Sequence, residues 1–133
     1  MIDIKGVAHF SIPVTDTKRS TEFYSEKLGL KVLMANHERG MVFLDAGGDC
    51  VILARVDGPI STARIDDVHH AFIVGHDAYE DAVKELRASG VEITFQEDLQ
   101  GGMVNGPRSY FYDPDGNALE IIDLTAYAGA AGS

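Results

Sequence analysis

Apolar and polar residues alternate along two segments of the chain that resemble each other. Residues 9–14 read HFSIPV and residues 69–74 read HHAFIV. Alternation with a period of two is typical of a β-strand that buries one face, so both segments predict strands that begin with histidine. The two segments start 60 positions apart (69 − 9). The chain therefore contains an internal repeat of about half its length.

A helix is predicted after each of these strands. Residues 16–28 read DTKRSTEFYSEKL and residues 77–89 read DAYEDAVKELRAS, and a glycine follows both segments. Asp77 and Glu80 have the spacing of a capping pair. The apolar positions that form the helix stripes are Phe23, Tyr24 and Leu28 in the first segment and Ala78, Ala82, Val83 and Leu86 in the second. Two amphipathic helices in equivalent places support the repeat.

Each helix is followed by one more predicted strand and then by a hairpin. These segments are residues 31–35 and 41–56 in the first half and residues 91–95 and 108–123 in the second. The turns of the two hairpins, residues 45–49 and 113–117, contain the glycine that tight turns favour. The order β-α-β-β-β therefore occurs twice, which predicts an α+β fold.

Residues 1–125 are expected to form a single domain of two modules. Module 1 covers about 4–56, a linker rich in Gly, Pro and Ser covers about 57–65, and module 2 covers about 66–124; the small-residue tail 126–133 is expected to be flexible. A module of this size buries too little surface to be stable alone, so two modules must pack together and leave a cleft. The alternative is one irregular α+β domain in which the repeat arises by chance.

Composition and charge limit the kinds of partner and compartment that we expect for this protein. Lys and Arg total 11 against 21 Asp and Glu, a net charge of −10, which disfavours nucleic acid and anionic membranes. No apolar run approaches the ~20 residues that span a bilayer. The single Cys50 cannot form an internal disulfide, and the first residues do not have the pattern of a secretory signal. We expect a cytoplasmic protein.

Three residues have the chemistry of metal ligands. His9 and His69 begin equivalent strands, and Glu120 lies on a strand where Leu119 and Ile121 face the opposite side. Each alone has an ordinary explanation, a hydrogen-bonded histidine at a strand start or a solvent-facing glutamate. Together they form a 2-His-1-carboxylate set, which suits divalent ions and leaves positions open for substrate.

These segments resemble the vicinal-oxygen-chelate (VOC) superfamily, which includes glyoxalase I, extradiol dioxygenases, fosfomycin-resistance enzymes and bleomycin-resistance proteins. The resemblance covers about residues 4–124 and rests on VAHFSIPVTD, FYSEKLGLKV, HHAFIV and YFYDPDGNALEI. It implies two modules in a half-open barrel around Fe²⁺, Mn²⁺, Zn²⁺ or Ni²⁺, with His9, His69 and Glu120 as ligands. It also implies a homodimer, in which the modules of two chains can pair.

Two details of this assignment depend on alignment. His69 has the same spacing to the following apolar residues as His9, whereas counting back from the helix starts favours His70. Glyoxalase I uses a fourth acidic ligand, and the hairpin alignment places Ile52 at that position. Fosfomycin-resistance enzymes carry basic residues around the substrate phosphonate, and no Lys or Arg follows Glu120. The resemblance therefore leaves the subfamily open.

Further candidates precede the second hairpin. Alternation places Arg108, Tyr110 and Tyr112 on one face of their strand. Arg108 could neutralise a carboxylate or enolate of the substrate, and Tyr110 could donate to a developing oxyanion. The ordinary alternatives are an ion pair with a surface acid and a half-buried strand tyrosine. Residues 97–107 read as a glycine-rich loop, a composition shared by lids and by surface loops.

The leading hypothesis is a metal-dependent enzyme, either a glyoxalase-like lyase or isomerase or an extradiol-type dioxygenase, that acts on a small oxygen-chelating substrate. Glu120 would serve as ligand and base, with Tyr110 and Arg108 as further catalytic residues. The alternative is a metal-free module that sequesters a ligand, as bleomycin-resistance proteins do, and an acidic surface suits a cationic ligand.

Overall fold

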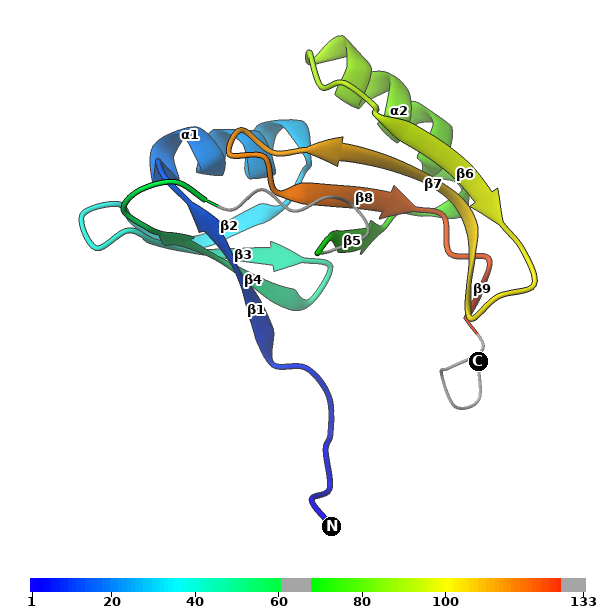
Figure 1. Ribbon diagram of the computed structural model, residues 1–133, viewed down its shortest axis with the longest axis horizontal. Coiled ribbons are helices and arrows are strands. Elements are labelled where there is room, and N and C mark those ends of the chain that lie inside the picture. Colours follow the sequence, from blue (N-terminus) through cyan, green and yellow to red (C-terminus); the bar gives the residue numbers. More distant parts are fainter. Residues whose placement is uncertain (61–67, 128–133) are drawn as a thin grey trace. The chain divides into compact units, whose positions relative to one another are not determined.

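The computed structural model describes residues 1–60 and 68–127, and the chain divides into two compact units at residues 61 and 62. The first unit contains, in order, β1 (His9–Val14), α1 (Thr17–Glu22), a π-helical turn (Phe23–Lys27), β2 (Lys31–Asn36), β3 (Met41–Ala46) and β4 (Asp49–Arg55). Its sheet has the order β1-β4-β3-β2, with β1 parallel to β4 and the other pairs antiparallel (Figure 1).

The second unit repeats this plan. Its elements are β5 (His70–Ile73), a 3₁₀ turn (His76–Ala78), α2 (Tyr79–Ala88), β6 (Phe95–Leu99), β7 (Val104–Tyr112), β8 (Ala118–Ile122) and β9 (Ala126–Tyr127). The order β5-β8-β7-β6 matches that of the first sheet, and β5 is parallel to β8 as β1 is to β4 (Figure 1). The predicted repeat and the α+β fold class are confirmed.

The core of the first unit follows from the alternation in β1. Ile12 and Val14 are fully buried, whereas His9 and Ser11 on the other side of the strand are exposed. The apolar side chains that complete this core are Tyr24, Val42, Leu44, Val51 and Leu53. The helix α1 contacts β3 and β4, and it starts one residue after the predicted start, because Asp16 is its N-cap and accepts hydrogen bonds from the backbone N–H groups of Lys18 and Arg19.

The second unit has an equivalent core and a polar link between helix and sheet. Val83 and Leu86 are the buried residues of α2, and Phe111, Leu119 and Ile121 are buried on β7 and β8. The hydroxyl groups of Tyr79 on α2 and Ser109 on β7 are 2.6 Å apart. Ser109 therefore faces the helix, which directs its neighbours on β7 to the opposite face of the sheet.

Two predicted boundaries in the second unit are wrong. The strand expected at residues 91–95 begins at Phe95, because Val91 ends the helix with a hydrogen bond to Leu86 O, and backbone pairing with β7 starts only at Thr94. The loop expected over residues 97–107 shrinks to 100–103, since β6 extends to Leu99 and β7 already begins at Val104.

The capping pair of Asp77 and Glu80 does not form. The chain enters α2 through a 3₁₀ turn, and no side chain caps either element. A contact from the sheet holds this helix start instead, since His76 Nδ1 lies 2.7 Å from Asp123 Oδ2 directly after β8. Tertiary packing thus replaces the local cap.

The two ends of module 2 lie partly outside the described residues. Of the linker expected at 57–65, residues 61–65 lie outside the described part of the chain, and the tail expected at 126–133 is described only to residue 127. Ala126 and Tyr127 form β9 and pair with Asn105 and Val104 of β7. None of the helices in residues 1–60 and 68–127 is long and apolar enough to cross a bilayer.

The first core provides a test of the fold. Leu53 is fully buried on β4 between β1 and β3, so Leu53→Ala is expected to lower the free energy of unfolding by about 2–5 kcal/mol. Leu33→Ala on β2 is the matched control, because Leu33 is 56% exposed and its loss should have little effect. Urea denaturation of the two variants measures the difference, and equal effects would contradict the assigned core.

Candidate metal site

Four polar residues share one face of the second sheet. Tyr110 on β7 pairs with Glu120 on β8, and Glu97 on β6 pairs with Arg108 on β7. Directly paired residues point to the same side of a sheet, and Arg108 and Tyr110 are two positions apart. The alternation expected for Arg108, Tyr110 and Tyr112 is therefore present, and this face also carries the Glu120 carboxylate.

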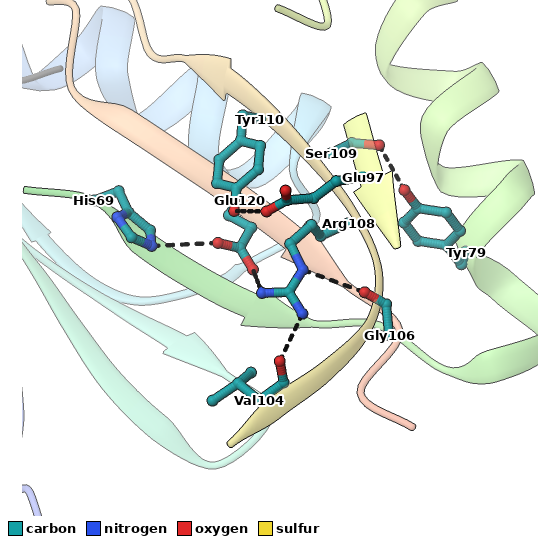
Figure 2. Close-up of polar contacts among 9 residues, drawn as sticks. All are labelled: His69, Tyr79, Glu97, Val104, Gly106, Arg108, Ser109, Tyr110 and Glu120. Carbon is teal, nitrogen blue, oxygen red and sulfur yellow. Dashed lines mark hydrogen bonds and ion pairs between the residues drawn. The ribbon is translucent and has the colours of Figure 1, made fainter. Parts of the chain in front are cut away.

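His69 and Glu120 lie side by side on this face. His69 Nε2 is 3.3 Å from Glu120 Oε1, as Figure 2 shows, and the Glu120 residue is only 2% exposed. A buried carboxylate requires a partner that offsets its lost hydration. The sheet places the imidazole there, because Ala71, two residues after His69, pairs with Glu120 itself.

The register of the two sheets favours His69 over His70 as the equivalent of His9. Ser11 on β1 pairs with Ile52 on β4, as Ala71 pairs with Glu120. Ile52 is therefore the structural counterpart of Glu120, as the hairpin alignment expects. His9 lies two residues before Ser11, and His69 lies two residues before Ala71. His70 instead pairs with Leu119, and burial lowers the pKa of its imidazole.

Arg108 borders the other oxygen of Glu120. Its Nη1 is 4.0 Å from Glu120 Oε2, while Nη2 donates to Val104 O at 2.8 Å and Nε donates to Gly106 O at 3.2 Å (Figure 2). The guanidinium is thus hydrogen-bonded to the main chain of its own strand. Its charge faces a protein carboxylate in this structure.

Tyr110 is a neutral hydrogen-bond donor in this cluster. Burial, together with the negative charges of Glu120 and Glu97, raises the pKa of Tyr110 to about 12. Its hydroxyl donates to Glu97 Oε1 at 3.2 Å (Figure 2). The sequence does not point to Glu97, because residues 97–107 read as a loop; the apolar residues two positions to either side, Phe95 and Leu99, are the available signal of a strand face.

Glu120 has an unusual proton affinity for a carboxyl group. Burial raises the pKa of Glu120, and the nearby Arg108 and His69 offset part of that rise. When the surroundings disfavour the negative charge of a carboxylate, a bound cation stabilises the ionised form. The chemistry of the pair, one imidazole nitrogen and one carboxylate oxygen, fits a divalent metal.

His9 belongs to the first unit. It is exposed at the start of β1, where it pairs with Cys50 on β4. Among residues 1–60 and 68–127, no three His, Cys, Asp or Glu side chains are grouped so as to hold a metal ion. Within the second unit, His69 and Glu120 are therefore two adjacent candidate ligands, and the addition of His9 is part of the proposal below.

Comparison with known proteins identifies the family. The model of the Glyoxalase/Bleomycin resistance protein/Dioxygenase superfamily matches residues 6–121, so the chain belongs to this superfamily. The chain is 32% identical over 130 residues to the uncharacterized protein YwkD of Bacillus subtilis, with 90% of this chain and 98% of YwkD covered. It is 30% identical over 120 residues to the glutathione transferase FosA of Serratia marcescens, with 89% and 80% covered.

A solved structure shows the same fold. It is a FosX fosfomycin resistance protein of Listeria monocytogenes, complexed with Mn(II) and 1S,2S-dihydroxypropylphosphonic acid. The TM-score is 0.73 at 21% identity, and the match covers 97% of this chain and 94% of FosX. The expected VOC fold is confirmed.

The raised pKa of Glu120 generates a prediction for the metal-free protein. A folded-state pKa above the unfolded value favours folding below the unfolded pKa, and this contribution is lost as pH rises through the folded pKa. Glu120→Gln should therefore match the wild type in stability near pH 4 and exceed it near pH 7. Thermal unfolding in the presence of a chelator measures the difference.

The control for this experiment is Glu85→Gln on the exposed side of α2. The difference in stability between Glu85→Gln and the wild type should stay constant across the same pH range. A wild type that gains stability over Glu120→Gln as pH rises would contradict the assigned environment of Glu120.

Proposed function

We propose that the chain is a divalent-metal-dependent enzyme of the VOC superfamily that acts on a small substrate through two adjacent oxygens. His9, His69 and Glu120 are the proposed ligands. The observation that carries this proposal is the buried Glu120 carboxylate with its Oε1 3.3 Å from His69 Nε2. A buried acid beside an imidazole destabilises the apo fold, and such an arrangement is typical of a functional site.

A divalent metal in this site would supply Lewis-acid polarisation of the bound substrate oxygens. The protein residues around it would handle the proton and the developing charge. Tyr110 stays protonated at neutral pH, since its pKa is about 12, and its position opposite Glu120 suits donation to an oxygen that becomes negative. The raised pKa of Glu120 suits a general base that accepts a substrate proton.

The relatives guide the choice of metal and substrate. One structural neighbour is described as a complex with Mn(II), so Mn²⁺ is the first metal to test, before Fe²⁺, Zn²⁺ and Ni²⁺. Phosphonate recognition has less support, because no Lys or Arg follows Glu120 and Arg108 is bound to its own main chain. Catechols and ketoaldehyde adducts are therefore better first substrates. They test extradiol-type dioxygenase and glyoxalase-like lyase or isomerase activity respectively.

We further propose that the chain acts as a cytoplasmic homodimer. The superfamily resemblance supports it, since a module of one chain can pair with a module of another. Such pairing would allow His9 of one chain to join His69 and Glu120 of its partner.

Metal analysis tests the proposed function. Protein purified without chelators or a nickel column is expected to carry close to one divalent ion per chain. His69→Ala should lose that metal. His76→Ala is the matched control, because His76 lies in the same unit and binds Asp123 instead of Glu120.

Two results would contradict this account. Retention of full metal content in His69→Ala would remove His69 from the site. A folded wild type that holds no metal after reconstitution with Mn²⁺, Fe²⁺, Zn²⁺ or Ni²⁺ would favour the metal-free, ligand-sequestering alternative.

A further inference from the structure

Arg108 is a buried charged residue of the second sheet, with a partner at each nitrogen of its guanidinium fork. Its side chain is only 7% exposed, and its guanidinium has three partners in two different strands. Nε and Nη2 donate to Gly106 O and Val104 O of β7, and Nη1 faces Glu120 Oε2 on β8. The planar guanidinium fork is suited to several fixed acceptors at once, which a lysine ammonium cannot satisfy in the same geometry.

The main chain that anchors Arg108 is itself fixed. Gly106 has φ of +128°, and a Cβ at this position would collide with the carbonyl oxygen of Asp123. Glycine therefore permits β7 to pass close to the segment that follows β8. The backbone pairs Asp123 N to Pro107 O and Thr125 N to Asn105 O hold the two segments together. The carbonyl acceptors of Arg108 are thus parts of a rigid framework.

The two oxygens of Glu120 face different partners as a result. Oε2 lies toward Arg108, at 4.0 Å from Nη1, and Oε1 lies toward His69, at 3.3 Å from Nε2 (Figure 2). A carboxylate held in this way presents one oxygen on the histidine side. A rotation that turned both oxygens toward the histidine side would draw the carboxylate away from the guanidinium.

We propose that Arg108 is a positioning residue that fixes Glu120 as a one-oxygen metal ligand, with Oε1 as the donor and Oε2 held by the guanidinium. This inference rests on the proposed function and reassigns Arg108. From the sequence, the charge of Arg108 is expected to meet a substrate carboxylate or enolate, whereas here it acts through Glu120. Groups that orient a ligand from outside the coordination sphere typically change metal affinity 10–100-fold when removed.

Arg108→Met and Arg108→Lys test this role. Met removes the charge and the fork while it keeps an unbranched side chain, and Lys keeps the charge but loses the fork. Both variants are expected to bind Mn²⁺ at least ~10-fold more weakly than the wild type, as measured by isothermal titration calorimetry. Their Co²⁺ complexes should show a changed visible absorption spectrum, because a released carboxylate alters the number or geometry of the donor atoms.

Arg87→Met is the matched control, since Arg87 is an exposed residue of α2 in the same unit. It should keep the wild-type affinity and spectrum. Circular dichroism establishes that each variant is folded, and Arg108→Lys carries the test if Arg108→Met does not fold.

The outcomes separate the two proposals. A wild type that binds neither Mn²⁺ nor Co²⁺ would overturn the proposed function and this inference with it. A wild type that binds metal, with wild-type affinity and spectrum in a folded Arg108→Lys or Arg108→Met, would overturn the positioning role alone. A wild-type spectrum that survives in Arg108→Lys and changes in Arg108→Met would also overturn it, because charge without the fork would then suffice.

Discussion

The carboxylate of Glu120, buried on a central strand of the second sheet, is the feature on which the site depends. Burial raises its pKa, so its charge needs the partners that the sheet supplies. His69 approaches one oxygen and Arg108 the other. An apolar residue at this position would make a simpler core, and the first unit has one, Ile52, at the equivalent place. The two repeats therefore differ in chemistry at this position, an isoleucine in the first unit and a carboxylate in the second.

The repeat explains how so short a chain builds such a site. Each unit uses the same order of strands, with a parallel outer pair, β1 with β4 and β5 with β8, that brings the start of one strand beside the middle of another. His69, just before β5, thus lies beside Glu120, although the residue that pairs with Glu120 is Ala71, two positions further along. His9 holds the equivalent place on β1, two residues before Ser11, which pairs with Ile52. The opposite face of each sheet carries the buried apolar residues that hold the unit together.

Much of this could be read from the sequence, because strict alternation and a 60-residue offset (69 − 9) are strong signals. The strand at His9, the strand predicted from His69, which starts one residue later at His70, the helix after Asp16 and the shared face of Arg108 and Tyr110 all follow from them. The start of β7 and the end of β6 did not, since Gly106 and Pro107 imitate a loop. The partners of Arg108 and the contact of Glu97 with Tyr110 depend on that hidden strand segment, so only the structure brings them together.

The central proposal is that Glu120 Oε1, His69 Nε2 and His9 are donors to one metal ion. Anomalous diffraction from crystals grown with Mn²⁺ tests it most directly, because manganese gives a signal that no protein atom matches at its absorption edge. The account predicts a single strong peak bonded to His69, to one oxygen of Glu120 and to His9 of the same chain or of the partner chain. A peak bound to other residues, or a peak that Glu120 does not touch, would contradict it.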